Sequence, residues 1–311
     1  MESLYPQICS FENLYLAYRK ARKGTRGKAP VASFEFNQEE QLLTLRDQLL
    51  AETWQPGPYH SFYVHEPKKR LISAAPFRDR VVHHALCNLI EPIWERRFIL
   101  DSYANRAGKG THRAILRANE FAKRYPYVLQ CDVEQFFPSL DHAILYAEIE
   151  RVIHDPPTLR LCQKIMKSGA GIHAGQYETN YFPGDDLFAA LRPRGLPIGN
   201  LTSQFWANVY LNPFDHFVKR ELRCPAYVRY VDDFLLFAAD KATLHGWKKA
   251  ILERLARTRL TLHEPQVFPV STGIPFLGFR IYPTHRRLKQ RRGIAFQRRF
   301  LSDQSGKDGR Q

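Results

Sequence analysis

The amino-acid sequence predicts an α+β fold for this chain of 311 residues. Strand-like and helix-like segments alternate along it, but without the regular strand–helix–strand rhythm of a doubly wound parallel sheet. Hydrophobic residues make up 44% of the chain, which is enough to build a sizeable core. No apolar run reaches the roughly 18 residues that span a membrane. These observations exclude a disordered chain and favour a globular α+β protein.

The first half of the chain combines helices with one pair of strands. Leucines at helical spacing predict a helix over residues 38–52, with Asn37 as its N-cap. Residues 59–73 have the pattern of two strands joined by a basic turn. Residues 80–98 predict a mostly buried helix. We expect this helix to be interrupted near Pro92, because proline removes a backbone donor.

The second half alternates strands with capped helices. We expect a strand over 126–133 that ends in an acid and a helix from Ser139 to about residue 153. A loop over 169–195 follows, then a helix from Asn200 to about Leu222 and a strand–turn–strand over 226–238. Asp240 is the expected N-cap of a further helix. One face of that helix carries Leu244, Trp247, Ile251 and Leu255. Short strands around Gly273 and Gly278 complete the pattern over 260–282.

The charge of the chain indicates a polyanionic partner. Lys and Arg number 46 against 31 Asp and Glu, so the formal net charge is +15. Basic residues gather in residues 19–28 and between Glu264 and Asp303, where no acidic residue occurs and Phe and Tyr are interleaved. Cations can hold phosphates while aromatic rings pack on bases. A generally basic surface is the alternative interpretation, but the clustering favours nucleic acid.

The cysteines and the N-terminal residues favour a reducing compartment. The five cysteines are widely spaced and form no CxxC pair, so we expect neither a disulfide framework nor a zinc site. The first residues lack the basic-then-apolar order of a signal peptide. We therefore expect a cytoplasmic protein without a membrane partner.

Carboxylates stand at the ends of very apolar segments. Asp132 follows the first segment, and Asp232 and Asp233 lie between two others. Each acid taken alone is explained as well by a turn or a cap. If the strands are neighbours, however, Asp132 meets one acid of the hairpin, and two close carboxylates call for a cation between them. Mg²⁺ suits such ligands, and two ions would support phosphoryl transfer on nucleic acid. This reasoning leaves a polymerase and a nuclease open.

Five motifs in order resemble those of reverse transcriptases. They are Lys68–Arg80 (KKRLISAAPFRDR) for the fingers, Asp132–Phe137 (DVEQFF) for the first palm motif, Arg194–Gln204 (RGLPIGNLTSQ) for the next, Tyr230–Asp233 (YVDD) for the YxDD box and Phe276–Phe279 (FLGF) for the primer grip. The likeness covers about residues 15–290. It implies a right-hand polymerase fold with fingers, a palm made of an antiparallel sheet backed by helices, and a short or vestigial thumb. The implied activity is RNA-directed DNA polymerisation.

The resemblance assigns a role to each matching residue. The implied catalytic acids are Asp132, Asp232 and Asp233. The implied ligands of two Mg²⁺ ions, with Mn²⁺ as a substitute, are Asp132, Asp232 and the Val133 carbonyl. The implied nucleotide site consists of Lys68, Arg70, Arg78, Phe137, Ile198 and Gly199. The implied primer grip is Phe276, Leu277 and Gly278, and the implied nucleic-acid contacts are Arg286, Arg287, Lys289, Arg291 and Arg292. A ring at Phe137 would collide with a ribose 2′-hydroxyl, although a core phenylalanine is the alternative there, and a solvated turn is the alternative for the cations.

Within the family, the chain most resembles the enzymes of diversity-generating retroelements. The likeness rests on Ile198–Gln204 (IGNLTSQ), Tyr103–Arg106 (YANR), Gly108–His112 (GKGTH) and Tyr282–His285 (YPTH). One alternative is another bacterial, archaeal or phage lineage: a group II intron-like, retron or phage-defence enzyme, some of them template-independent. The other is an inactive RNA-binding scaffold, against which the retained acids argue.

Three departures from the family shape the expectations. Ile198 stands where retroviral enzymes carry Gln, which predicts low fidelity. The fourth palm motif has His263 but no Lys, so His263 is a candidate general acid, although a surface role is more frequent. Few residues follow FLGF. The resemblance to retroelement enzymes implies a small basic helical accessory protein, usually a pentamer, which would act beside the template RNA, primer or cDNA, and dNTPs. The expected domains are fingers over 1–125, a palm over 126–275 with an excursion over 154–195, and a primer-grip hairpin with a basic thumb-like tail over 276–311.

Overall fold

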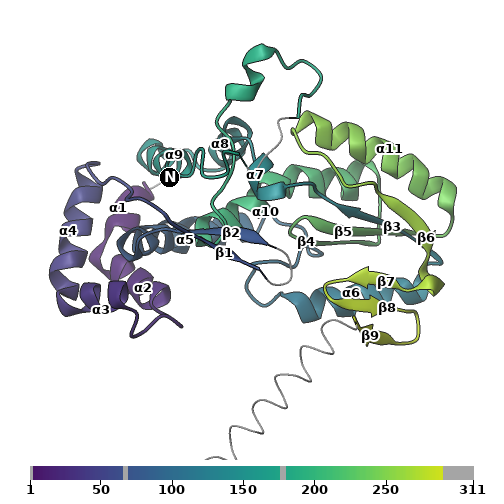
Figure 1. The fold of residues 1–311 in the computed structure, drawn as a ribbon, viewed down its shortest axis with the longest axis horizontal. Coiled ribbons are helices and arrows are strands. Elements are labelled where there is room, and N and C mark those ends of the chain that lie inside the picture. Colours follow the sequence, from purple (N-terminus) through teal and green to yellow (C-terminus); the bar gives the residue numbers. More distant parts are fainter. Residues whose placement is uncertain (1–2, 66–68, 176–179, 290–311) are drawn as a thin grey trace, which may run out of the picture. The chain divides into compact units, whose positions relative to one another are not determined.

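The computed structural model describes residues 3–65, 69–175 and 180–289 (Figure 1). Its contacts divide the chain into two compact units. Unit 1 consists of residues 1–99, 134–216 and 253–261, and unit 2 of residues 100–133, 217–252 and 262–311. Helices and antiparallel sheets occur in both, so the predicted α+β class is confirmed. The expected fingers, palm and thumb ranges remain predictions, since this division follows packing alone.

Unit 1 is mostly helical. Its helices are α1 (Tyr5–Cys9), α2 (Phe11–Ala21), α3 (Ala29–Phe36), α4 (Gln38–Leu50), α5 (Phe77–Glu95), α7 (Phe136–Ser139), α8 (His142–Glu150), α9 (Pro156–Ser168) and α10 (Leu201–His216), with a 3₁₀ turn over Leu187–Leu191. Its strands β1 (His60–Val64) and β2 (Arg70–Ala74) form an antiparallel ribbon. The long apolar helix α5 is central, and Phe77 at its start packs against Tyr18 of α2 and Phe34 of α3.

Unit 2 contains two antiparallel sheets. The larger has the order β4 (Tyr227–Tyr230), β5 (Asp233–Ala238), β3 (Tyr127–Asp132) and β6 (Gln266–Pro269). The smaller consists of β7 (Ile274–Phe276), β8 (Phe279–Ile281) and β9 (Arg286–Leu288). Short helical turns cover Phe217–Glu221 and Val270–Thr272, and the boundary between the units falls within α11 (Lys241–Arg257). Helix α6 (Thr111–Arg124) is strongly amphipathic and buries Ile115, Ala118 and Phe121 against both sheets.

Local patterns predicted several elements correctly. The strand pair over 59–73, the strand over 126–133 and the strand–turn–strand over 226–238 correspond to β1–β2, β3 and β4–β5. Asp240 caps α11, because its carboxylate accepts the Thr243 N–H at 2.7 Å. The predicted apolar face of α11 is buried at Leu244, Ile251 and Leu255. Asn37 occupies the N-cap of α4, but its side chain makes no capping bond there.

Three predictions of helix ends and caps were wrong. Pro92 does not interrupt α5, which continues to Glu95 because Ile90 and Trp94 on either side of it are buried. Ser139 ends α7, and the next helix is capped by Asp141, which accepts the Ala143 and Ile144 N–H groups. The Asn200 side chain precedes α10 but bonds to the backbone of β2 and the following residue.

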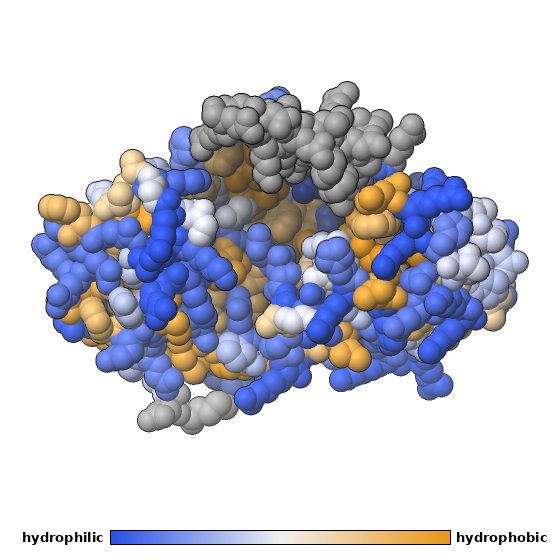
Figure 2. All heavy atoms as spheres, turned by 90° about the horizontal axis from the view of Figure 1, so that it is seen from below, coloured by the Kyte–Doolittle hydropathy of each residue, from blue (hydrophilic) through white to orange (hydrophobic). Residues whose placement is uncertain are grey.

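One face of the molecule is chiefly polar. On the face seen in Figure 2, hydrophilic side chains predominate and apolar ones form scattered patches. In the described part of the chain, no helix is long and apolar enough to cross a membrane. All five cysteines are buried as free thiols. Burial raises the pKa of Cys9 to about 11, so this thiol is protonated and unreactive at neutral pH.

Candidate active site

Strands β3 and β5 bring two carboxylates into direct opposition. Their register pairs Asp132 with Asp233. The Val133 N–H donates to the Asp232 carbonyl at 3.3 Å. Hydrogen-bonded and non-hydrogen-bonded pairs alternate along antiparallel strands, so Asp132 and Asp233 form a non-hydrogen-bonded pair. In such a pair the Cα atoms are about 4.5 Å apart and the side chains are closest. The sequence predicted that Asp132 lies beside one acid of the hairpin, and in the strand register that acid is Asp233.

Asp232 lies in the tight turn that joins β4 to β5. Tyr230 pairs with Asp233, which leaves Val231 and Asp232 as the two central residues of the turn. Val231 has φ +56°, and Asp232 is not among the residues with positive φ. A positive φ at the first central residue only is the pattern of a type II′ turn. A β-branched residue rarely adopts a positive φ, so the turn stores strain. Strain of this kind is retained mostly at functional sites.

The Val133 carbonyl also points to this hairpin. Within a strand, the N–H and C=O of one residue point to the same side, and the Val133 N–H points to Asp232. On the other side, the Asp132 carbonyl accepts the His263 N–H at 3.0 Å. The His263 side chain is exposed. His263 is therefore a backbone neighbour of the acids, and a proton-donating role for it stays a prediction.

The donor set of these acids suits Mg²⁺ shared with a substrate. Two or three carboxylates and one carbonyl are hard oxygen ligands. Among the described residues, no group of three or more His, Cys, Asp or Glu side chains is arranged to hold a metal ion alone. Mg²⁺ commonly takes one or two carboxylates and completes its shell with water and substrate phosphates. The residues present fit that mode of binding.

The predicted primer grip is a two-residue hairpin in the same unit. Leu277 and Gly278 connect β7 to β8, and both have positive φ, +47° and +86°, as a type I′ turn requires. Phe276 is buried, and the Gly278 carbonyl accepts the Lys289 N–H at 3.0 Å. The Gln130 amide on β3 donates to the Pro275 carbonyl at 2.8 Å, which ties this hairpin to the strand that ends in Asp132.

The predicted basic contacts are placed only in part. Arg286 and Arg287 are exposed on β9, and Lys289 follows it. Arg291 and Arg292 lie outside the described residues, as does Lys68.

Unit 1 brings together most of the predicted nucleotide-binding residues. The Ser73 N–H of β2 donates to the Ile198 carbonyl at 2.9 Å. The Asn200 carboxamide accepts the Ala75 N–H at 3.0 Å and donates to the Ser73 carbonyl at 2.8 Å. The Leu196 N–H donates to the Phe137 carbonyl at 2.9 Å. The loop over 194–200 is therefore fixed between the β1–β2 ribbon and α7.

Gly199 has a packing reason for lacking a side chain. Its φ is +112°, and a Cβ there would lie 2.8 Å from Cγ2 of Ile72 on β2. A side chain would therefore strain the backbone and clash with the ribbon. The expectation that Gly199 also lets a base pair approach the backbone remains a prediction.

The two arginines of the predicted triphosphate site differ in their surroundings. Arg70 is exposed at the start of β2. Arg78 lies in the first turn of α5, where its guanidinium donates to the Gln48 side chain. Phe137 is partly exposed and packs edge-on against Phe136 at 5.5 Å, whereas Phe136 is buried. Phe136 is thus the core residue of the pair, and Phe137 is the accessible ring.

Sequence reasoning missed two buried histidines that hold the loop over 194–200. His142 Nε2 contacts the Gly195 carbonyl at 2.8 Å, and His173 Nε2 contacts the Leu196 carbonyl at 3.0 Å. Burial lowers the pKa of both imidazoles, so each is neutral at pH 7 and donates its Nε2 proton. A lone histidine in the sequence carries no signal for this role.

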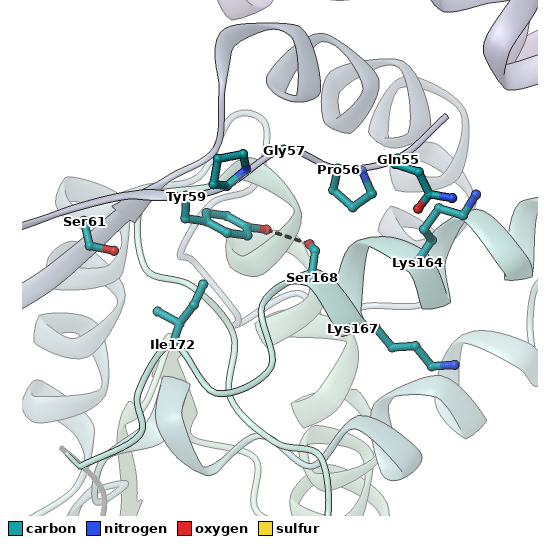
Figure 3. Close-up of a pocket in the computed structure, with 10 residues that line it drawn as sticks. Gln55, Pro56, Gly57, Tyr59, Ser61, Lys164, Lys167, Ser168 and Ile172 are labelled. Carbon is teal, nitrogen blue, oxygen red and sulfur yellow. Dashed lines mark hydrogen bonds between the residues drawn. The ribbon is translucent and has the colours of Figure 1, made fainter. Parts of the chain in front are cut away.

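A groove of about 620 Å³ in unit 1 was also missed (Figure 3). Residues 55–59 form one wall, and Lys164, Lys167 and Ser168 of α9 contribute to the other. The Tyr59 hydroxyl and Ser168 Oγ are 3.1 Å apart. Lys164 is anchored by the Glu52 and Trp54 carbonyls.

Comparisons with known proteins identify relatives of this chain. Protein YkfC of Escherichia coli K12 is 27% identical over 297 residues, covering 82% of this chain and 74% of that protein. Group II intron-encoded protein LtrA of Lactococcus lactis is 25% identical over 222 residues, covering 69% of this chain but 35% of LtrA. Nuclear intron maturase 2 of Arabidopsis thaliana is 26% identical over half of this chain and 24% of its own length.

Solved structures share the fold. The apo telomerase of Candida tropicalis superposes with a TM-score of 0.54 at 12% identity, covering 76% of this chain and 49% of that one. The telomerase of Candida albicans, in complex with a fragment of telomeric RNA, gives a TM-score of 0.51 at 12% identity and covers 46% of that chain. Such low identity speaks for the fold alone.

The family assignment follows from the length of the match. Residues 64–281 match the family described as reverse transcriptase (RNA-dependent DNA polymerase). That range contains the opposed acids Asp132 and Asp233, the strained turn with Asp232, and the glycine turn of the primer-grip motif. The chain therefore belongs to the reverse transcriptase family, with relatives among group II intron-encoded proteins.

Proposed function

We propose that this protein is an RNA-directed DNA polymerase. The observation that carries the proposal is the β3–β5 register, which sets Asp132 opposite Asp233 beside the turn that bears Asp232. In the proposal, Asp132, Asp232 and the Val133 carbonyl hold two Mg²⁺ ions together with the phosphates of a dNTP. Two bound ions would activate the primer 3′-hydroxyl and neutralise the departing pyrophosphate. Asp233 supports the site from the strand.

The remaining roles in the proposal follow the sequence motifs. Arg70 and Arg78, with Lys68, hold the triphosphate, and the accessible ring of Phe137 excludes a 2′-hydroxyl. Ile198 and Gly199 face the incoming base pair. The hairpin at Phe276–Gly278 holds the primer, and the arginines and lysine over 286–292 contact the nucleic-acid backbone. The positive net charge of +15 supports binding to RNA and cDNA.

We further propose that the enzyme serves a diversity-generating retroelement. Support comes from the segments IGNLTSQ, YANR and YPTH in the sequence. The proposal includes error-prone synthesis, because the apolar Ile198 cannot make the polar contact of a glutamine. It also includes a small basic accessory protein, pentameric in that lineage, and a cytoplasmic location. The relatives among group II intron proteins favour a maturase-like enzyme as the second candidate.

Primer extension on an RNA template with Mg²⁺ and dNTPs tests the proposal. We expect template-dependent cDNA from the wild type and none from Asp232→Asn. Product without template would indicate a template-independent polymerase of the defence type. Absence of product, even with the accessory protein and its own RNA, would indicate a scaffold.

Two further variants test the finer assignments in the same assay. We expect Ile198→Gln to lower misincorporation opposite adenine, and an unchanged error rate would refute the fidelity argument. We expect His263→Ala to leave the rate of nucleotide addition unchanged. A large fall in that rate, with a shifted pH profile, would assign His263 as the general acid.

A further inference from the structure

Strand β4 buries a charged side chain directly beneath the strained turn. Arg229 is 0% exposed. Its Nη1 donates to the Val231 carbonyl at 2.9 Å and its Nη2 donates to Ser102 Oγ at 3.1 Å. Transfer of a guanidinium from water into a protein interior carries a large desolvation cost. A cation in this position therefore calls for a role that a neutral side chain of similar size could not fill.

The bond to the Val231 carbonyl acts on the central peptide of the turn. Type I′ and type II′ turns differ mainly in the direction of that peptide, because ψ of the first central residue and φ of the second change together. The Arg229 guanidinium holds the carbonyl of the Val231–Asp232 peptide on its own side. The nitrogen of the same peptide belongs to Asp232. The direction of this peptide therefore sets the backbone from which the Asp232 carboxylate projects.

The backbone of Arg229 is itself firmly held. Its N–H donates to the Asp101 carbonyl and its carbonyl accepts the Tyr103 N–H, both at 3.0 Å. The Asp101 carboxylate is buried and accepts Arg117 Nε at 2.9 Å and Lys219 Nζ at 3.2 Å. The segment that anchors Arg229 is thus tied to α6 and to the helical turn after α10. A side chain on so rigid a base can fix the turn above it.

We propose that Arg229 is a positioning residue that locks the Val231–Asp232 peptide and thereby aims the Asp232 carboxylate at bound metal. The inference rests on the proposed function, because it assigns a metal-binding role to Asp232. It adds a residue that lies outside the set predicted from the sequence. Lysine can replace one of the bonds to Val231 and Ser102 and keeps the charge, whereas methionine is unbranched and neutral and replaces neither.

The test compares Arg229→Lys and Arg229→Met with the wild type, and uses Arg124→Met as the control. Arg124 is an exposed arginine in the last turn of α6, in the same unit. Mn²⁺ affinity is measured by electron paramagnetic resonance with template-primer and a non-hydrolysable dNTP analogue bound, because substrate phosphates complete the metal shell. The rate constant kcat is measured per titrated active site, together with KM for dNTP and Kd for template-primer.

We expect Arg229→Met to weaken Mn²⁺ binding severalfold and to lower kcat per active site by at least about tenfold, since small misplacements of reacting groups have large effects. Template-primer Kd should change less than twofold. Arg229→Lys should fall between, and Arg124→Met should match the wild type. A merely structural arginine would instead lower the active fraction and leave Mn²⁺ affinity and kcat per active site unchanged, and that result would overturn the proposal.

Two further comparisons keep the proposal falsifiable. If Arg229→Met does not fold, Ser102→Ala replaces it, because this change removes one acceptor of the guanidinium and keeps the charge. Weaker Mn²⁺ binding in both Ser102→Ala and Arg229→Lys supports the proposal, and wild-type binding in both refutes it. If the wild type binds Mn²⁺ but makes no cDNA, the polymerase assignment fails, while the Mn²⁺ comparison still decides the role of Arg229.

Discussion

Replacement of Gly199 by alanine should strongly destabilise unit 1, for two reasons that can be separated. The backbone at Gly199 has φ +112°, which costs an L-residue about 1–3 kcal/mol. The new Cβ would also lie 2.8 Å from Cγ2 of Ile72, a stiff β-branched side chain on β2. Relief of such overpacking costs about 1–3 kcal/mol. We therefore expect Gly199→Ala to lower the free energy of unfolding by about 2–6 kcal/mol.

A double-mutant cycle in urea separates the two costs. Ile72→Ala removes the clashing methyl group, so Gly199→Ala in that background should retain only the backbone cost. The expected coupling energy is about 1–3 kcal/mol. Gly171→Ala is the matched control, because Gly171 has φ +77° and no heavy atom within 4 Å of the position of a Cβ. It should show the backbone cost alone.

Two results would refute this reasoning. One is a cost for Gly199→Ala that does not exceed that of Gly171→Ala. The other is a coupling with Ile72→Ala below about 0.5 kcal/mol, which is the scatter of additive pairs. In either case the loop over 194–200 would be free to move away from the ribbon, against the hydrogen bond between the Ser73 N–H and the Ile198 carbonyl.

Three other predictions concern stability. Asp132→Asn should abolish cDNA synthesis. In the absence of metal it should raise the free energy of unfolding by up to about 1 kcal/mol, because it relieves the repulsion between Asp132 and Asp233. A lower free energy of unfolding at low salt would contradict this. Burial lowers the pKa of His83 to about 3 from an unfolded value near 6.5. The neutral His83 therefore contributes fully to the free energy of unfolding above pH 6.5, and this contribution falls by about 2 kcal/mol between pH 7 and 5. His83→Gln should remove that part of the pH dependence of the free energy of unfolding, measured by urea titration at several pH values. Asp141 is buried between two arginines and caps α8, so Asp141→Ala should cost about 3–5 kcal/mol in the same assay, and Asp141→Asn, which keeps the cap, should cost less.

Local signals account for the elements that the sequence predicted. Asp240 and the apolar face that follows it predicted α11 correctly, because the cap and the buried side chains both lie within one segment of the sequence. Ser139 failed as a cap because Asp141, two residues later, offers a stronger acceptor to the helix N–H groups. Asn200 failed because its partners on β2 lie about 125 residues earlier in the chain. A pattern within one segment cannot reveal such a partner.

The same distinction applies to the site. The three acids could be proposed from the sequence because each lies beside an apolar run in a motif of fixed order. Arg229 was not, since a basic residue in a strand is ordinarily exposed and nothing in YVRYVDD indicates which side it faces. The groove at Tyr59 and the two histidines that bond to carbonyls, His142 and His173, were not predicted for a similar reason. Their roles depend on elements more than 20 residues apart.

Backbone strain links three of the motifs. Gln135 in DVEQFF, Val231 in YVDD and Leu277 in FLGF have φ values of +43°, +56° and +47°, although none is glycine, asparagine or aspartate. In each case a nearby donor holds a carbonyl of the strained segment: Ser139 Oγ on Gln135 at 2.8 Å, Arg229 on Val231 at 2.9 Å, and the Lys289 N–H on Gly278 at 3.0 Å. Strained conformations persist only where the surroundings determine them. Replacement of any one of these donors should therefore release the strain of the segment that it holds and change the backbone geometry of that motif.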